Sequence, residues 1–560
     1  MQLQVPKEHL KGLLFVSYPS FCVNGQEIPG GEERERERLK EQERSLSLVD
    51  VCWPKGRSGE SRLARKGGGR AKRKRMRLLS IFCVTVRLIA ILALIAVSIL
   101  SDTALATSTL SRVEYDAMLR NVLGDELNER VHELGTMSDS DAFLDRSFLG
   151  VGWEKAAATL RAWMREAGLE VWTDEIGNVH GRTPASVSAD APVLMLGSHF
   201  DTVRDGGKYD GALGVLAAIS AVKALMLSRD ASQLLARPIQ VVGFADEEGS
   251  RFFSSYIGSR ALTGDLVSSG DLETLRDAGG KTLAEVLTDG GLDGRIEAVS
   301  KAQLVPSQLY GYVELHIEQG PVLESMERPI AAVSAIIGAT SHMYKISGQQ
   351  GHAGTSPMHL RKDALAGAAD IVLFIEQLCS SHDKVREDML VCTVGRLEAK
   401  PSVSNVISGD VMLTVDMRAY SSEVLQSVAS AVQEEVAIIC EKRGLAHSLV
   451  RVRAPRPSVV MDESLTQAIV KAGTRASTTA DRVWGPHASS SSTRIPEHNT
   501  LPRLMSGAGH DASAMSTLTR VGMIWVRCKD GISHSPREFV EERDIAEAAT
   551  TLFHLLEEQL

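Results

Sequence analysis

Apolar residues in the middle of the chain recur with two different spacings. Trp153–Ala167 repeats them at helical spacing and ends before Gly168, which predicts an amphipathic helix with a glycine at its C-terminus. Val193–Leu196 and Ile239–Phe244 are fully apolar, as buried parallel strands are, and Leu213–Met226 between them is apolar enough for a buried helix. Strands that alternate with helices indicate an α/β domain.

The pattern between residues 340 and 453 is different, because it predicts the order βαββαβ of a ferredoxin-like sandwich. The predicted elements are the strands Met343–Ser347, Val391–Glu398, Val411–Arg418 and Ser448–Arg453 and the helices Asp363–Leu378 and Ser422–Lys442. A later strand, Met523–Arg527, and the amphipathic helix Ile545–Leu556 suit a return to the α/β domain, so the sandwich is expected as an insertion. The serine-rich run Ala488–Thr493 is expected to be a mobile surface loop.

The first hundred residues have another character. Residues 32–44 alternate in charge and residues 62–75 are strongly basic, which is typical of solvated or disordered segments. The uncharged run Leu88–Leu100 follows several arginines and precedes the small-x-small sequence Ala104-Leu105-Ala106, and this order is that of a secretory signal.

Residues 76–106 are therefore expected to be a signal peptide, or a signal anchor that stays in the membrane as the only membrane contact. Residues 1–75 are expected to be disordered, or an extension wrongly included in the predicted gene. The expected location is the endoplasmic reticulum or the secretory pathway.

Composition sets further bounds on the class of protein. The chain has 560 residues, 43% of them apolar and 24% charged, with a formal net charge of −9, so it has room for several domains and is too acidic for a typical nucleic-acid binder. The patterns predict a main domain from residues 107–335 and 455–560 and an inserted domain from residues 336–454. None of the seven cysteines forms a CxxC pair, and the later ones are expected as buried thiols rather than a disulfide framework.

Imidazole and carboxylate side chains follow the predicted strands of the main domain at the ends where open α/β sheets place their sites. They are His199 and Asp201 in GSHFD, Asp210 in GGKYDG, Glu247 and Glu248 in DEEG, His316 in HIEQG and His534 in GISHSP. Each one alone is more often a hydrogen-bonded structural residue. As a set without cysteine they suit borderline divalent ions such as Mn²⁺ or Zn²⁺.

Seven segments carry a resemblance to a known family, and it extends from about Val113 to the C-terminus. They are GSHFDTV, GGKYDGALGV, ADEEGSRF, VELHIEQGPVLE, GHAGTSPMHLRKDA, SGAGHDA and GISHSP. The chain closely resembles the allantoate amidohydrolase and N-carbamoyl-amino-acid hydrolase branch of the dinuclear metallopeptidase clan. Within it, GKYDG, SGAGHDA and VRCKDGISHSP are most similar to the plant-type, allantoate-hydrolysing members.

The resemblance implies a zinc-peptidase-like catalytic domain that binds two divalent ions per subunit, with Mn²⁺ expected and Zn²⁺ as the alternative. His199, Asp210 and His316 would hold one ion; Asp210, Glu248 and His534 would hold the other, with Asp210 bridging. Asp201 would fix the tautomer of His199. Glu247 would be the general base that moves a proton from the attacking water to the leaving nitrogen.

The resemblance also implies a homodimer formed through the inserted α+β domain, which would act as a lid. His352, in GHAG, would reach the partner subunit's site and stabilise the oxyanion of the transition state. Asn405 and Arg418 would contact the substrate, since an arginine suits a carboxylate through a two-pronged hydrogen bond. Gln319 and His510 would lie in or near the pocket.

The implied reaction is metal-dependent hydrolysis of allantoate to ureidoglycine (or ureidoglycolate), carbon dioxide and ammonia in purine catabolism, with a small ureido compound as the partner molecule. One residue departs from the family pattern: Ser341 stands where the family usually has an arginine, and His342 is expected to replace part of the lost charge. The serine is familiar in the ureidoglycolate-hydrolysing branch. Alternatives are therefore a ureidoglycolate amidohydrolase, an N-carbamoyl-L-amino-acid hydrolase, a dinuclear peptidase, and an inactive ligand-binding paralogue.

Overall fold

The computed structural model describes residues 110–558 except for 185–190, 231–234, 384–386 and 487–499. The expected extension, the expected signal segment and the serine-rich run Ala488–Thr493 lie outside the described residues. The described chain forms a main domain and an inserted domain, which runs from Gly338 to Arg456.

The main domain is built on a nine-stranded mixed sheet in the order β1-β2-β4-β3-β5-β15-β6-β13, with β14 also paired to β6. Its strands are β1 Glu170–Thr173, β2 Val179–Arg182, β3 Val193–His199, β4 Ile239–Phe244, β5 Leu309–Ile317, β6 Ile330–Ile336, β13 Val459–Val460, β14 Arg503–Ser506 and β15 Val521–Val526. The four central strands β4, β3, β5 and β15 are parallel, so their carboxyl ends lie at one edge of the sheet. This confirms the predicted α/β class and the predicted apolar strands.

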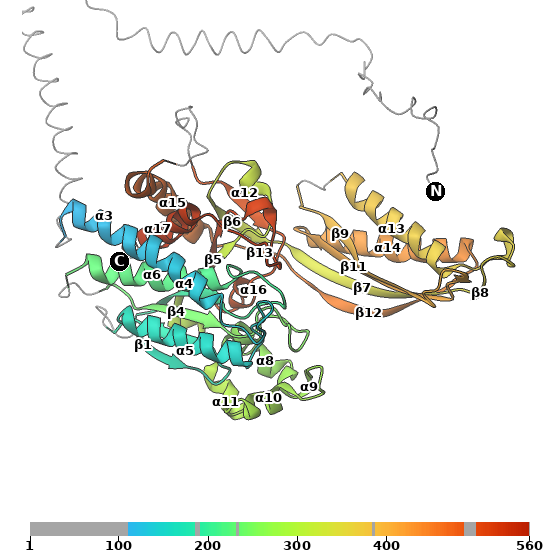
Figure 1. The fold of residues 1–560 in the computed structure, drawn as a ribbon, viewed down its shortest axis with the longest axis horizontal. Coiled ribbons are helices and arrows are strands. Elements are labelled where there is room, and N and C mark those ends of the chain that lie inside the picture. Colours follow the sequence, from blue (N-terminus) through green and yellow to red (C-terminus); the bar gives the residue numbers. More distant parts are fainter. Residues whose placement is uncertain (1–109, 185–190, 231–234, 384–386, 487–499, 559–560) are drawn as a thin grey trace, which may run out of the picture. The chain divides into compact units, whose positions relative to one another are not determined.

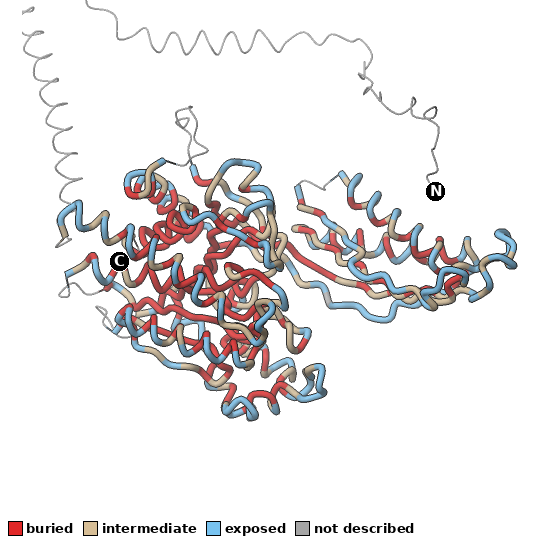
Figure 2. Tube along the Cα trace, viewed as in Figure 1, coloured by how far each residue is buried: buried red, intermediate tan, exposed pale blue. Residues whose placement is uncertain are grey.

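Helices cover this sheet and bury its apolar side chains (Figures 1 and 2). The larger ones are α3 Arg112–Arg120, α4 Glu126–Leu134, α5 Val151–Glu166, α6 Ala212–Ser228, α15 Glu463–Trp484 and α17 Glu542–Glu558, and a π-helical turn, Asn121–Asp125, joins α3 to α4. The helix α5 ends as predicted, because Gly168 adopts a φ of 82° and donates its N–H to the Arg165 carbonyl at 2.9 Å. The helix α6 is almost entirely buried, between the sheet and α17.

Shorter helices fill the connections. They are α7 Ile257–Thr263, α8 Asp265–Ser268, α9 Asp271–Thr274, α10 Leu283–Asp289, α11 Ile296–Val299, α12 Val322–Ser325 and α16 Asp511–Met515. The first five lie between β4 and β5, and no pattern in the sequence analysis predicted them.

The inserted domain has the βαββαβ order expected from the sequence, and its four antiparallel strands are arranged β12-β7-β11-β9. Its elements are β7 Gly338–Ser347, α13 Ala364–Ser381, β9 Val391–Lys400, β11 Asp410–Ala419, α14 Ser422–Lys442 and β12 Ala446–Arg456, and a small ladder pairs β8 Gly351–His352 with β10 Val406–Ile407. One face of the sheet packs on the two helices in a separate core, and burial along β11 alternates strictly (Figure 2). The helix α13 is long and apolar enough to cross a membrane, but it packs on β9 and β11.

The expectation that all the later cysteines are free thiols is wrong for two cysteines of the inserted domain. Cys379 at the end of α13 and Cys392 at the start of β9 form a disulfide with a Cα–Cα distance of 6.0 Å. The helix end and the strand start lie side by side, which their spacing of 13 residues along the chain does not reveal. Cys440 and Cys528 are buried free thiols, as expected.

Candidate metal centre

The predicted ligands come from five separate segments that meet at the carboxyl edge of the parallel strands. His199 is the last residue of β3, His316 lies near the end of β5, and Asp210 lies in the loop that leads into α6. Glu248 follows β4, and His534 follows β15. Because the strands are parallel and adjacent, their ends converge although the residues are far apart in sequence.

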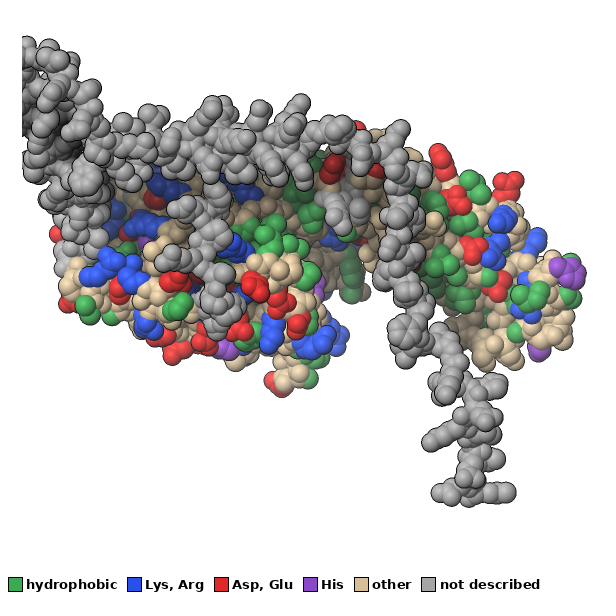
Figure 3. Space-filling view, turned by 90° about the horizontal axis from the view of Figure 1, so that it is seen from above, with side chains coloured by type: hydrophobic (Ala, Val, Ile, Leu, Met, Phe, Trp, Pro, Cys, Tyr) green, Lys and Arg blue, Asp and Glu red, His purple; other side chains and the backbone are tan. Residues whose placement is uncertain are grey.

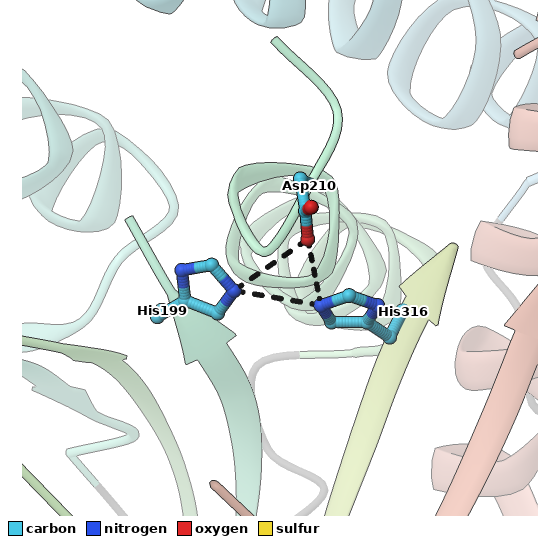
Figure 4. A group of neighbouring side chains, drawn as sticks. All are labelled: His199, Asp210 and His316. Atoms are coloured by element: carbon cyan, nitrogen blue, oxygen red, sulfur yellow. Dashed lines mark hydrogen bonds and ion pairs between the residues drawn. The ribbon is translucent and has the colours of Figure 1, made fainter. Parts of the chain in front are cut away.

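The first group is His199, Asp210 and His316 (Figure 4). The Nε2 atom of His316 lies 3.1 Å from Asp210 Oδ1 and 3.4 Å from His199 Nε2, while His199 Nε2 lies 3.7 Å from Asp210 Oδ1. All three side chains are buried. Gly211, with a φ of 64°, follows the aspartate, and a Cβ at this position would stand 2.3 Å from the His199 ring. A glycine is therefore needed where the loop passes the imidazole.

The second group shares the same aspartate. His534 Nε2 lies 3.2 Å from Asp210 Oδ2 and 3.3 Å from Glu248 Oε1, so the two oxygens of Asp210 point toward different groups. The ring of His534 is half exposed, at 49% of its side-chain surface, and the second group therefore opens to solvent. Within each group the potential ligand atoms all lie within 4.8 Å of one another.

This geometry fits two metal ions. Ligand atoms bound about 2.0–2.2 Å from one ion stand roughly 3–3.5 Å apart. The distances in the two groups, 3.1 to 3.7 Å, are close to this range. Asp210 Oδ1 is buried and has no hydrogen-bond partner among the described residues. A buried carboxylate oxygen that faces two imidazole nitrogens without a hydrogen bond is the arrangement a cation would satisfy. Burial raises the pKa of Asp210, but the three neighbouring histidines outweigh this effect and hold the pKa well below its usual value.

Glu247 and Glu248 have different surroundings, as the sequence analysis expected. Glu248 joins His534, whereas Glu247 is buried with its Oε2 3.9 Å from His199 Nε2. Burial raises the pKa of Glu247 well above its ordinary value, against the effect of His199, and the charge of Glu248 adds to the rise. A carboxyl group with a raised pKa next to a metal cluster is suited to carry a proton.

Asp201 does more than the sequence analysis predicted. His199 Nδ1 lies 3.2 Å from the Asp201 backbone carbonyl and 3.5 Å from its carboxylate, so the carbonyl is the nearer acceptor that orients the ring. The two carboxylate oxygens accept the backbone N–H groups of Glu247 and Glu248 at 3.0 and 3.1 Å. Asp201 therefore positions the pair of acids as well as the imidazole.

Glu538 is a positioning residue that the sequence analysis missed. Its Oε1 accepts the backbone N–H groups of Tyr209 and Asp210 at 2.9 and 3.1 Å and so fixes the loop that presents the shared carboxylate. Burial, together with the charge of Asp210, raises the pKa of Glu538 to about 7. Its only signal in the sequence is its place four residues after His534, where other acidic residues follow closely.

Gln319 and His510 lie at the cluster itself. Gln319 donates from Nε2 to Asp210 Oδ2 at 2.8 Å and to Ser533 Oγ at 3.1 Å. The ring of His510 packs edge-on against that of His316, with 4.4 Å between centroids. Burial and then the neighbouring His316 hold the pKa of His510 well below its ordinary value, so this ring is neutral.

The other predicted contact residues lie on the inserted domain and outside the cluster. His352 and Asn405 are exposed, on β8 and in the turn before β10, and the Asn405 carbonyl accepts the Ala353 N–H at 2.9 Å. The ten residues of β7, at about 3.3 Å each, carry the chain roughly 33 Å from the main domain before β8 begins. Arg418 lies at the near end, on β11, where Nη1 donates to the Gly507 carbonyl at 2.8 Å and Nε to Asp416 at 2.7 Å.

The expectation for His342 is wrong. Side chains alternate along β7, and His342 faces the helices, where its Nδ1 lies 3.1 Å from the Tyr344 hydroxyl. Ser341 faces the opposite side of the sheet. Burial lowers the pKa of His342, so its ring does not supply a positive charge in place of the missing arginine.

Comparisons with known proteins agree with this geometry. The model of peptidase family M20/M25/M40 matches residues 195–558. The chain is 39% identical to the allantoate deiminase of Arabidopsis thaliana over 454 residues, which cover 78% of this chain and 83% of that relative.

Two solved structures match the fold. The amidase of the hydantoinase/carbamoylase family from Burkholderia multivorans has a TM-score of 0.66 and 31% identity. The structure of AtUAH in complex with glyoxylate has a TM-score of 0.63 and 28% identity. Each alignment covers 78% of this chain and 97% of the solved chain.

A mixed α/β sheet with this cluster at its carboxyl edge, together with these similarities, defines an amidohydrolase. The chain belongs to the peptidase family M20/M25/M40.

Proposed function

We propose that this enzyme hydrolyses allantoate and releases ammonia, with ureidoglycine or ureidoglycolate and carbon dioxide as the other products. The observation that carries the proposal is the cluster itself: two groups of ligands share Asp210, and Glu247 lies beside them. The similarity to the allantoate deiminase of Arabidopsis thaliana supports the choice of substrate.

The chemistry requires an activated water because a ureido-type carbon is a poor electrophile. Two divalent ions in these groups would polarise the carbonyl and lower the pKa of water toward about 7. Glu247 takes the proton from the attacking water and delivers it to the leaving nitrogen, and its raised pKa suits both steps. Asp201 and Glu538 keep the acids and Asp210 in place during the reaction.

Mn²⁺ is the ion we propose, with Zn²⁺ as the alternative. The ligands are imidazole nitrogens and carboxylate oxygens without a thiolate, a combination that suits borderline divalent ions. Metal analysis of the purified protein, followed by reconstitution of the chelated protein with each ion, measures which one restores ammonia release.

We also propose that the inserted domain forms a homodimer. Its strand β9 is an edge strand, and exposed apolar side chains lie on β9, α13 and α14: Val391, Leu397, Leu373 and Ile438. Figure 3 shows hydrophobic side chains among the charged ones on this part of the surface. Dimerisation would bring His352 and Asn405 to the partner subunit's cluster, which they do not reach within their own chain. Sedimentation velocity tests the oligomeric state.

Entry into the secretory pathway through residues 76–106 is a further proposal. The Cys379–Cys392 disulfide supports it, because structural disulfides persist in oxidising compartments. The location is tested with a fluorescent fusion, which is expected in the endoplasmic reticulum. The disulfide is tested by mass spectrometry of the linked peptides without reduction. An anchor that is not cleaved would leave the enzyme in the membrane fraction after carbonate washing.

A second candidate substrate class is the N-carbamoyl-L-amino acids. The similarity to the hydantoinase/carbamoylase amidase from Burkholderia multivorans favours it. Ser341 favours a ureidoglycolate-type substrate as a third. One experiment separates them: the Mn²⁺-loaded protein from residue 107 onward is assayed for ammonia with allantoate, ureidoglycolate and N-carbamoyl-amino acids. Activity only on a substrate other than allantoate rejects the proposal.

A further inference from the structure

Tyr256 lies where three segments of the molecule meet. It is the residue before α7, and its backbone N–H donates to the Glu247 carbonyl at 3.0 Å. Its hydroxyl accepts a hydrogen bond from Nη1 of Arg456 at 2.8 Å, and the Arg456 guanidinium lies 5.5 Å from the centre of the tyrosine ring. Arg456 is the last residue of β12, where the chain leaves the inserted domain. Tyr256 therefore connects the inserted domain to the backbone of the proposed general base.

The third segment is the loop that leads to His510. A Cβ on Gly509 would collide with the Tyr256 hydroxyl, so a glycine is needed where the loop passes this side chain. The next residue, His510, packs edge-on against the candidate ligand His316. The buried hydroxyl of Tyr256 is therefore held between Arg456 and a loop that adjoins the metal cluster.

The backbone of Tyr256 has an unusual conformation. Its φ is 67°, in the left-handed region that bulky side chains rarely adopt. Such a conformation costs free energy and persists when the surrounding contacts impose it. The Tyr256 N–H is bound to Glu247, and its carbonyl accepts the N–H of Arg260 at 2.8 Å. Because the backbone and the hydroxyl are both held, a shift of the ring at Arg456 also shifts the N–H that holds Glu247.

The position of Glu247 matters for the proposed reaction. Its backbone is held from two sides, since its N–H donates to Asp201 at 3.0 Å and its carbonyl accepts the Tyr256 N–H. Its carboxylate must reach both the attacking water and the leaving nitrogen, and a displacement of about 1 Å can cost about 100-fold in rate. A contact that fixes one of the two backbone groups therefore affects proton transfer.

We propose that Tyr256 is a positioning residue, which places Glu247 for proton transfer through its hydrogen bond with Arg456 of the inserted domain. Turnover then depends on the contact between the two domains as well as on the metal cluster. The proposal rests on the proposed function, because it assigns Tyr256 a part in that reaction.

The test uses the full chain, loaded with Mn²⁺, as five proteins: the wild type, Tyr256→Phe, Arg456→Met, the double variant of these two, and Tyr344→Phe. Tyr256→Phe removes the hydroxyl and keeps the ring beside the guanidinium. Tyr344→Phe is the matched control, because it also removes a buried hydroxyl, whose partner at 3.1 Å is His342 inside the inserted domain. The measurements are kcat and KM for allantoate, metal content, and the free energy of unfolding in urea.

Loss of the hydrogen bond is expected to lower kcat per bound metal about 10-fold in Tyr256→Phe and in Arg456→Met, with KM within about 2-fold of the wild type. The double variant should be no slower than the slower single variant, because both changes remove the same bond. Tyr344→Phe should keep the wild-type kcat. An unchanged kcat in Tyr256→Phe, a rise in KM in place of the fall in kcat, losses that multiply in the double variant, or an equal loss in Tyr344→Phe overturns the proposal.

Failure of the proposed function gives a different result. A wild type that releases no ammonia from allantoate rejects that function, and the five proteins are then compared on the ureidoglycolate or N-carbamoyl-amino acid that the wild type does hydrolyse. The unfolding measurements need no substrate. Strictly additive losses in the free energy of unfolding would show that Tyr256 and Arg456 do not interact, and would overturn the proposal for every substrate.

Discussion

At the scale of single residues, Glu247 and Glu248 show how neighbours in sequence take different roles. Both carboxylates lie within ligand distance of His199, but Glu248 also lies with Asp210 and His534, whereas Glu247 is buried and has a raised pKa. Glu247→Gln is therefore expected to keep both metals and to lose turnover by about 10²- to 10⁴-fold. His316→Ala, which removes a ligand, should lose metal instead. Metal analysis and ammonia release measure both, and near-normal turnover in Glu247→Gln would contradict the assigned role.

Glu538 makes a second prediction at this scale. It is in neither group of candidate ligands but accepts the backbone N–H groups of Tyr209 and Asp210. Glu538→Ala should lower metal affinity by about 10- to 100-fold, the usual effect of removing a support behind a ligand. Glu538→Gln keeps an oxygen acceptor and should retain most of the affinity. Titration against a competing fluorescent chelator measures the metal dissociation constant of each variant. Equal affinities in the wild type and Glu538→Ala would show that the loop with Tyr209 and Asp210 keeps its conformation without Glu538.

The candidate ligands were predictable because they are imidazole and carboxylate side chains that come directly after strands predicted from the hydrophobic pattern. The residues that position these ligands were not predictable, because their contacts join segments that lie far apart in the sequence. The resemblance placed Asp201 behind His199, but its hydrogen bonds to the N–H groups of Glu247 and Glu248 depend on the turn after β4. Nor could spacing tell which face of β7 His342 takes, since a shift of one residue reverses every side chain.

At the scale of elements, the apolar patterns predicted the main helices and strands to within three residues at each end, except that β7 begins five residues before the predicted strand Met343–Ser347. The helix α14 has the predicted bounds, and β4 has the predicted bounds as well. The short strands β1 and β2 and the small helices between β4 and β5 were not predicted. They have only four to seven residues, and unlike β4 they are not continuous apolar runs, so they show neither a period nor an apolar stretch. The disulfide was not predicted, because the local sequence around Cys379 and Cys392 does not show that α13 ends next to the start of β9.

The packing of α15 on α17 makes a prediction for pH. His554 of α17 is buried, with Nε2 2.9 Å from Thr479 Oγ1 of α15 and Nδ1 2.8 Å from Glu557. Burial lowers the pKa of His554 below its ordinary value of 6.5, although Glu557 opposes this effect. As the pH falls below 6.5, the unfolded chain takes up a proton that the folded chain resists, so the free energy of unfolding must fall.

The variant His554→Gln removes this contribution. It is expected to be less stable than the wild type at neutral pH and to lose less stability between about pH 7 and pH 5.5. Urea unfolding of both proteins at several pH values, in the presence of a chelator to exclude metal effects, measures the two slopes. Equal slopes would mean that His554 titrates in the folded protein as it does in the unfolded chain.

At the scale of the whole molecule, the proposed dimer would bring together the candidate metal cluster of one subunit and His352 of the other, which lie far apart within a single chain. The cluster belongs to the main domain, and His352 stands at the far end of a ten-residue strand. A chain with Glu247→Gln keeps its own His352, and a chain with His352→Ala keeps its own Glu247. If each site takes its histidine from the partner subunit, both homodimers are inactive, but a mixed dimer has one complete site.

Mixing the two inactive variants therefore tests the arrangement directly. Random exchange of subunits makes half of the dimers mixed, with one working site in each, so about a quarter of wild-type activity should return. Activity should appear at the rate of subunit exchange, which gel filtration of a tagged and an untagged chain measures separately. If His352 acts within its own chain, neither variant has a complete site and mixing cannot restore one. A mixture that stays inactive after complete exchange would therefore show that His352 does not act at the partner subunit's site.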